Sequence, residues 1–102
     1  MEGKKYDSDK PRFSLLPEGT MLEIVKVLEH GAKKYGKDNW RSLDNFDERY
    51  YNAIMRHLEA WRNGEKIDPD SGLPHLAHIG CSVLFLLSKE LKNVTNPSTV
   101  SD

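Results

Sequence analysis

The chain has 102 residues, of which 15 are basic and 16 acidic, so its formal net charge at pH 7 is −1. This length predicts one domain, and the balanced charge, with no uninterrupted basic run, argues against nonspecific binding of nucleic acid polymers. Because so small a domain buries only a modest core, a homo-oligomer is favoured.

The distribution of apolar residues predicts a soluble, cytoplasmic protein. Cys81 is the single cysteine and lies in an apolar run, which predicts a buried free thiol in a reducing compartment. The first ten residues have no apolar core and do not resemble a signal peptide. The longest apolar run, residues 79–87, is interrupted by Ser82 and is too short to span a membrane.

The N-terminal third predicts an arm followed by a helix. Residues 1–16 read as a charged, extended arm, because the residue before Pro11 avoids helical backbone angles. We expect its apolar end, residues 13–16, to dock on the body, and a frayed terminus is the alternative for residues 1–8. A helix is predicted over 18–35, ending at Gly36, with an apolar stripe of Met21, Ile24, Val25, Leu28 and Ala32.

Residues 36–46 predict a loop that contains an aromatic residue beside a cation. Gly36 and the following Asp, Asn and Ser residues are turn formers. Trp40 with Arg41 can form a lid over a base or a phosphate. The alternative is that Trp40 plugs one end of a small core, and the residues alone favour this packing role.

Two further helices are predicted, and they complete an all-α, compact bundle of three main helices. The second is capped by Asp44 or Asp47 and runs to Asn63, with a stripe of Tyr50, Ile54, His57, Leu58 and Trp61. The third spans 72–91 after a cap at Asp70 or Ser71, and it is expected to be the most buried, with a seam of Leu73, Leu76, Ala77, Gly80, Leu84, Leu87 and Leu91. The domain is assigned to residues 1–92, and residues 93–102 predict a polar, disordered tail.

The segment between the last two helices concentrates the groups that can carry chemistry. His75 and His78 share a helix face, and His57 lies on the facing helix. The acids of the intervening turn include Glu65, Asp68 and Asp70, and such a set resembles a metal site. The alternatives are a core histidine at position 57 and a capped turn with solvated acids, and capping alone explains Asp70.

Carboxylates between helices favour Mg²⁺ or Mn²⁺, which prefer oxygen ligands and lower the pKa of a bound water. Nearby cations could hold phosphate charge, and we consider Arg12, Lys33, Lys34 and Arg41 for this role. Together these features point to a nucleotide phosphohydrolase.

Three stretches, in order, match one family. They are KYDSDKPRFSLLP (5–17), GAKKYGKDNWR (31–41) and AIMRHLEAWRNGEKIDPDSGLPHLAHIGCSVLFLL (53–87). The chain closely resembles the phage dATP/dGTP diphosphohydrolases, the MazZ-type enzymes, which are similar to the all-α MazG pyrophosphohydrolases. The resemblance implies a MazG-like bundle, a homodimer or homotetramer, and Mg²⁺ or Mn²⁺. It also implies that dGTP and dATP are converted to the monophosphate and pyrophosphate.

The resemblance also implies a biological setting, an infected bacterium whose phage replaces adenine by 2-aminoadenine in its Z-genome. There the enzyme supplies dGMP and depletes the ordinary purine pool. MazG proteins bind metal through E-E-x-x-E on one helix and E-x-x-D on the next. In this chain His75 and His78 stand at the E-x-x-D positions.

The predicted site therefore combines histidines with the acids of the turn. The expected metal ligands are His57, Glu65, Asp70, His75 and His78, and the expected catalytic residues are His57, Glu65 and Asp70. The expected substrate-binding residues are Arg12, Lys33, Lys34, Trp40 and Arg41, with Trp40 stacking on a purine.

Two other functions compete with this hydrolase. One is a small, non-catalytic helical module that binds a protein partner, favoured by the apolar third helix. The other is a phosphohydrolase of HD type that releases the nucleoside, which is disfavoured because no adjacent His-Asp pair occurs in the chain.

Overall fold

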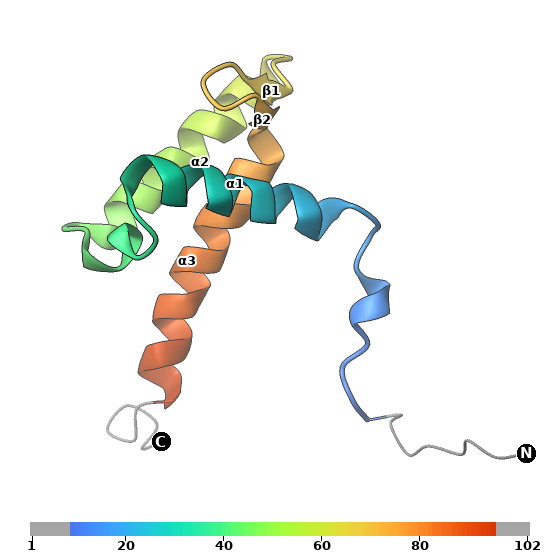
Figure 1. The fold of residues 1–102 in the computed structure, drawn as a ribbon, viewed down its shortest axis with the longest axis vertical. Coiled ribbons are helices and arrows are strands. Elements are labelled where there is room, and N and C mark those ends of the chain that lie inside the picture. Colours follow the sequence, from blue (N-terminus) through green and yellow to red (C-terminus); the bar gives the residue numbers. More distant parts are fainter. Residues whose placement is uncertain (1–8, 96–102) are drawn as a thin grey trace, which may run out of the picture.

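A computed structural model describes residues 9–95, with residues 93–95 described by their backbone alone. It contains three α-helices: α1 (Thr20–Tyr35), α2 (Phe46–Arg62) and α3 (His75–Thr95). A two-stranded antiparallel hairpin, β1 (Ile67–Asp68) and β2 (Leu73–Pro74), joins α2 to α3 (Figure 1). Single 3-10 turns are η1 (Phe13–Leu15) and η2 (Asn39–Ser42). The predicted all-α bundle of three main helices is confirmed.

Helix α3 is the centre of the fold. It packs against both α1 and α2. Helix α1 runs across α3 rather than alongside it (Figure 1). Among residues 9–92, the buried side chains are mostly on α3: His75, Ala77, Cys81 and Ser82, with Val27 opposite on α1. This arrangement confirms α3 as the most buried helix, and it confirms Cys81 as a buried free thiol.

The apolar stripes predicted for the individual helices are partly wrong. On α1, Met21 and Val25 are exposed, while Val27, which lies outside the predicted stripe, is buried. On α3, Leu87 and Leu91 of the predicted seam are 45% and 51% exposed. The physical reason is that α1 crosses α3 over a short patch of small residues, so the long side chains on either side of the crossing stay uncovered.

Gly80 marks the point where the two helices come closest. A Cβ atom at this position would lie 2.7 Å from Ile24 Cδ1. We therefore expect Gly80→Val to destabilise the fold by about 1–3 kcal/mol, because it overpacks this contact. At Gly31 in α1 a Cβ atom would meet nothing within 4 Å, so Gly31→Ala is expected to stabilise by about 0.5–1 kcal/mol. Urea unfolding measures the stability of both variants. Equal changes in the free energy of unfolding would contradict the close approach of α1 to α3 at Gly80.

The predicted docking of the N-terminal arm is also wrong. Phe13 is 78% exposed and Leu15 69% exposed, and the arm leads away from the three helices (Figure 1). The reason is the turn before α1, where Gly19 has φ of 82° and directs the chain outward. Residues 1–8 of the predicted arm lie outside the described residues.

The observed helix ends refine the predicted ones. Helix α1 begins at Thr20 rather than 18 and stops where Gly36 takes φ of 100°. The N-cap of α2 is Asn45 with φ of 53°, so the predicted caps Asp44 and Asp47 are wrong.

The hairpin delays the start of α3 to His75, because Leu73–Pro74 pairs with Ile67–Asp68 instead of entering the helix. This also removes the predicted capping role of Asp70 and Ser71. The helix continues to Thr95, past the predicted end at 91 and past the proposed domain boundary at 92. The rest of the predicted tail, residues 96–102, lies outside the described residues. No helix within residues 9–95 has both the length and the apolarity needed to cross a membrane.

Candidate functional site

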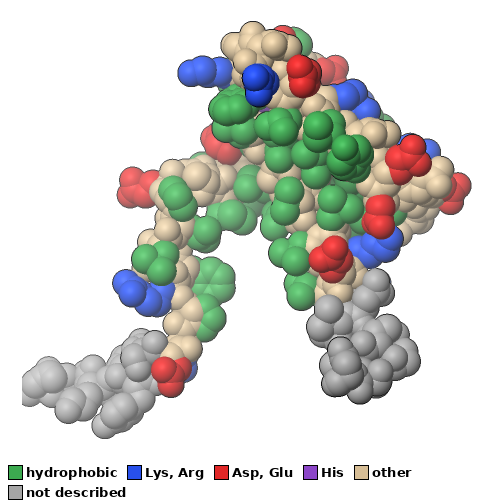
Figure 2. Space-filling model, turned by 180° about the vertical axis from the view of Figure 1, so that it is seen from behind, with side chains coloured by type: hydrophobic (Ala, Val, Ile, Leu, Met, Phe, Trp, Pro, Cys, Tyr) green, Lys and Arg blue, Asp and Glu red, His purple; other side chains and the backbone are tan. Residues whose placement is uncertain are grey.

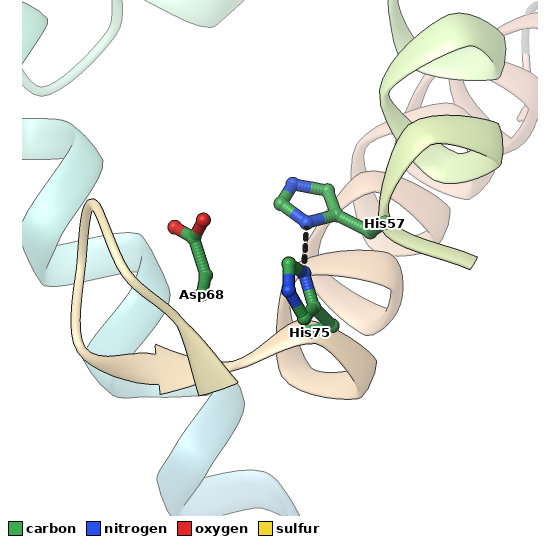
Figure 3. Close-up of side chains that lie close together, drawn as sticks. All are labelled: His57, Asp68 and His75. Atoms are coloured by element: carbon green, nitrogen blue, oxygen red, sulfur yellow. Dashed lines mark hydrogen bonds between the residues drawn. The ribbon is translucent and has the colours of Figure 1, made fainter. Parts of the chain in front are cut away.

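Three elements bring a carboxylate and two imidazoles together beside the hairpin. His57 comes from the C-terminal half of α2, Asp68 ends β1, and His75 is the first residue of α3. One ligand atom from each of the three lies within 4.8 Å of the others. Figure 3 shows the Asp68 carboxylate on one side and the two imidazole rings in contact on the other. We call these three residues the His–Asp–His cluster.

The hairpin turn holds Asp68 in place. Ser71 donates two hydrogen bonds to Asp68 Oδ2, from its backbone N–H at 3.2 Å and from its hydroxyl at 2.9 Å. The turn closes with Gly72 N–H donating to the Asp68 carbonyl at 2.7 Å. Partial burial alone would raise the pKa of Asp68, but the hydrogen bonds from Ser71 outweigh it and leave that pKa below its ordinary value. Asp68 is therefore a fixed carboxylate at neutral pH.

Glu65 fixes the protonation of His75. Its Oε1 lies 2.7 Å from His75 Nε2, so the imidazole donates from Nε2 to the carboxylate. A neutral His75 then carries its lone pair on Nδ1, which lies 2.8 Å from His57 Nδ1. His57 donates across this contact, and its own Nε2 keeps a lone pair. The contact is thus a chain of hydrogen bonds from His57 through His75 to Glu65.

His78 extends the network on the other side of His57. Its Nε2 donates to the Ser71 hydroxyl oxygen at 2.7 Å, which in turn donates to Asp68. The rings of His57 and His78 stack, with centroids 4.5 Å apart and an angle of 9°. Burial lowers the pKa of His57, and the neighbouring histidines lower it further. Burial also lowers the pKa of His78, although Asp68 opposes this.

The His–Asp–His cluster fits a divalent cation. Two neutral imidazoles and a carboxylate are the protein donors of many metal sites with open positions. Ligand atoms on one ion at about 2.1 Å lie at most about 4.2 Å apart, so a group already within 4.8 Å needs little closure. Glu65 hydrogen-bonds the far nitrogen of His75, which is the usual arrangement around a metal-bound histidine.

A cavity of about 800 Å³ lies beside the cluster, where α1 and α2 diverge over α3. Its lining includes His57, Asp68 and His78 and the aromatic side chains of Trp40 and Phe85. Its volume suits a nucleotide. Basic side chains line it from α1, from the loop that follows α1, and from α2: His30, Lys34, Lys37, Arg49 and Arg56.

Not every predicted metal ligand or catalytic residue joins the cluster. Glu65 lies behind His75 as its hydrogen-bond acceptor, and His78 contacts Asp68 at 3.5 Å rather than His75. Asp70 lines the same cavity, but its exposed carboxylate pairs with Lys34 Nζ at 3.3 Å.

The predicted substrate-binding residues are scattered. Lys34 and Trp40 line the cavity, whereas Arg12 and Lys33 are exposed and do not line it. Arg41 lines a separate, smaller hollow and pairs with Asp38 at 3.0 Å.

Trp40 is partly buried and packs against α3, which favours the packing role that the loop residues predict. Its ring stacks on Phe85, with centroids 4.2 Å apart and an angle of 13°. The Arg41 guanidinium lies over the same ring at 4.4 Å. Stacking on a purine, which stays a prediction, would compete with these internal contacts.

Sequence reasoning missed three residues at this site. Asp68 is among the acids of the turn, but the predicted ligand set does not include it. Ser71 is predicted only as a helix cap, and Arg56 has no predicted role in the site. Within residues 9–92, Arg56 makes no hydrogen bond or ion pair, and it lines the cavity next to His57. The signal for Arg56 was its place beside a histidine on an otherwise apolar helix face.

Comparison with known proteins places the chain in a family. The family model described as "dATP/dGTP diphosphohydrolase, N-terminal" matches residues 1–97. The chain belongs to this family. The match contains every residue of the His–Asp–His cluster and the whole cavity, so the site described above is a feature of a dATP/dGTP diphosphohydrolase N-terminal domain.

The chain is similar to the dATP/dGTP diphosphohydrolase of Salmonella phage PMBT28. The two are 34% identical over 86 residues, which is 84% of this chain and 29% of the relative. The chain thus spans less than a third of that protein's length. No solved structure matches, so the predicted likeness to the MazG fold stays a prediction.

The buried thiol of Cys81 gives a test of the packing around α3. Burial raises the pKa of Cys81 to about 11, and the thiolate is the form that reacts. We expect a disulfide reagent at pH 8 to label the native protein at least about tenfold more slowly than the urea-unfolded chain. Absorbance at the released thiolate's band measures both rates, and equally fast labelling of the native protein would contradict the burial.

Proposed function

We propose that this domain carries the active site of a nucleotide pyrophosphohydrolase. The substrates are dGTP and dATP, and the products are the monophosphate and pyrophosphate. The observation that carries the proposal is the nucleotide-sized cavity, which is lined by His57 and Asp68 of the His–Asp–His cluster and by basic side chains. Family membership and the name of the phage relative support the choice of substrate.

We assign different parts of the cavity wall to different parts of the nucleotide. Arg56, next to His57 in sequence, and Lys34 on the opposite helix carry positive charge toward the cavity. We assign them to the triphosphate, where guanidinium and ammonium groups offset the charge of phosphate oxygens. The apolar part of the wall, with Leu28 and Phe85, is left for the base and sugar.

The reaction adds water to the α-phosphorus and breaks its bond to the bridging oxygen, so pyrophosphate leaves. His78 lines the cavity and donates from Nε2 to Ser71, which leaves Nδ1 with a lone pair. We assign His78 as the group that accepts the proton of the attacking water. Asp68 and His57 stand beside it as ligands rather than as bases.

The cofactor in this proposal is a divalent cation, Mg²⁺ or Mn²⁺, held by His57, Asp68 and His75. When bound, such an ion supplies charge neutralisation for the phosphates and lowers the pKa of water. Glu65 orients His75, and Ser71 orients Asp68. Of the predicted catalytic residues, His57 and Glu65 keep a role in holding the cation. Asp70 is instead the ion-pair partner of Lys34.

The proposed setting is the cytoplasm of an infected bacterium. There, the products dGMP and dAMP would leave the triphosphate pool. The dGMP would feed 2-aminoadenine synthesis for a phage Z-genome, and the loss of dGTP and dATP would disfavour ordinary purines. The phage origin of the relative supports this setting.

The assembly in this proposal is a homodimer or homotetramer. Apolar side chains gather on the face opposite the view of Figure 1 (Figure 2). Several exposed large apolar residues of α2 and α3 do not line the cavity, among them Tyr51, Met55 and Leu58 on α2 and Leu76, Val83, Leu87 and Leu91 on α3. We call this set the α2–α3 apolar face. A second copy of the chain would cover it and supply the burial that the small core lacks.

The α2–α3 apolar face also suits the second candidate, a non-catalytic module that binds a protein partner. One assay separates the two functions. The protein is incubated with each of the four dNTPs and Mn²⁺ or Mg²⁺, and the products are identified by ³¹P NMR. The hydrolase predicts dGMP or dAMP together with pyrophosphate. Orthophosphate or tripolyphosphate would contradict the reaction, and no turnover at all would favour the binding module.

A further inference from the structure

We propose that the His–Asp–His cluster selects a first-row transition-metal cation over Mg²⁺, with two imidazole nitrogens and one carboxylate oxygen as the protein ligands. The inference deepens the proposed function, on which it rests, by naming the class of cation and by replacing the predicted ligand Asp70 with Asp68. It also assigns Glu65 and Ser71 as positioning residues outside the ligand set.

The donor atoms favour this class of cation. Mg²⁺ binds oxygen ligands and keeps several waters, whereas imidazole suits transition metals. Two of the three clustered donors are imidazole nitrogens. A site built for Mg²⁺ would need carboxylates where these histidines stand.

The other acids near the cluster are engaged elsewhere. The Asp70 carboxylate is 72% exposed and pairs with Lys34, and Glu65 is bound to the far nitrogen of His75. The Asp68 side chain is 17% exposed, and one of its carboxylate oxygens lies within 4.8 Å of a ring nitrogen of both His57 and His75 (Figure 3). Asp68 is therefore the one clustered carboxylate within residues 9–92 that is free to complete the set.

The surrounding hydrogen bonds form a preorganised outer layer. Glu65 accepts from Nε2 of the almost fully buried His75, which selects Nδ1 as the ligating nitrogen. Ser71 donates twice to Asp68 and receives a hydrogen bond from His78, so the carboxylate cannot turn away without breaking a network. His75 and Asp68 therefore each have their own hydrogen-bond partner outside the ligand set, which a chance grouping of surface histidines would lack.

The two rings are close enough to bind one ion. Their Nδ1 atoms lie 2.8 Å apart across a hydrogen bond that His57 donates. Ligation of both atoms to one cation requires His57 to carry its proton on Nε2, so that each Nδ1 offers a lone pair. Metal binding at the cluster would therefore replace the hydrogen bond between His57 and His75.

The test uses Mn²⁺ alone as the probe, without nucleotide. The electron paramagnetic resonance signal of free Mn²⁺ is titrated with the full chain, and electron spin echo modulation reports imidazole nitrogen on the bound ion. We expect one Mn²⁺ per chain, nitrogen modulation in the bound state, and little displacement by a hundredfold excess of Mg²⁺. Asp68→Asn and His57→Ala should each weaken Mn²⁺ binding at least about tenfold, and His57→Ala should reduce the nitrogen signal.

Matched controls separate ligation from folding. Asp70→Asn changes an acid two positions from Asp68 and should bind Mn²⁺ like the unaltered chain. Glu65→Gln keeps the shape of a positioning residue and should weaken binding about tenfold while nitrogen modulation persists. Far-UV circular dichroism establishes that each variant is folded. Displacement of Mn²⁺ by equimolar Mg²⁺, or unchanged binding in Asp68→Asn, would overturn the proposal.

The outcome is distinguishable from failure of the proposed function. A chain that binds Mn²⁺ through nitrogen but releases no pyrophosphate keeps the metal assignment and loses the reaction. A chain that hydrolyses dGTP with Mg²⁺ and shows no nitrogen modulation keeps the reaction and loses the assignment.

Discussion

Asn in place of Asp68 should lower the turnover number for dGTP by at least about a hundredfold, the loss expected when a metal that contributes several kcal/mol to the transition state is poorly held. Asparagine has nearly the same shape as aspartate, and its amide oxygen can still accept the hydrogen bonds of Ser71. The substitution therefore removes the negative charge and leaves the hairpin turn intact. Steady-state release of pyrophosphate measures the effect.

The matched control is Asp70→Asn in the same turn. Its carboxylate is exposed and paired with Lys34, and exposed pairs contribute little to stability. Turnover by this variant is expected to stay within about threefold of the unaltered chain. The reverse pattern, with Asp70→Asn inactive and Asp68→Asn active, would restore the ligand set expected from the sequence and contradict the one seen in the fold.

A pair of charges on the α2–α3 apolar face should convert the oligomer to a monomer. Val83 and Leu87 lie one turn apart on α3 and are each 45% exposed. In the proposed oligomer a second copy buries them, and two buried glutamates without partners would cost several kcal/mol per subunit pair. Val83→Glu with Leu87→Glu is therefore expected to elute with the mass of a single chain in light-scattering chromatography.

The control for this variant is Asn52→Glu, which adds a charge to exposed α2 without removing an apolar side chain. It should retain the oligomer. If the unaltered chain already has the mass of a monomer at micromolar concentration, the proposed assembly is wrong and the α2–α3 apolar face needs another partner.

Much of the fold could be predicted from the order of apolar and turn residues. The apolar run from Ile79 to Leu87 identified α3 as the central helix, and Gly36 marked the end of α1. The facing sides of the helices could not be predicted as well. Helical spacing assumes that neighbours run alongside, whereas α1 crosses α3 at Gly80, so the covered patch is short and made of small residues.

The location of the site could be predicted from the sequence, but the residues that form its ligand set could not. Three histidines on two adjoining helices marked the region, and the structure gathers His57, His75 and His78 there. Choosing between Asp68 and Asp70 was not possible from spacing, because both lie in one turn. Ser71 donates hydrogen bonds to Asp68 only once the hairpin has closed, and these bonds hold the Asp68 carboxylate near the histidines. Asp70 pairs with Lys34 instead.

Hydrolysis of dGTP by the full chain in ¹⁸O-labelled water with Mn²⁺ tests the central claim most directly. If the cluster and cavity direct water to the α-phosphorus, mass spectrometry will find one ¹⁸O in dGMP and none in pyrophosphate, and Asp68→Asn will form almost no product. Label in pyrophosphate, or label in dGMP at an unchanged rate from Asp68→Asn, would contradict the account.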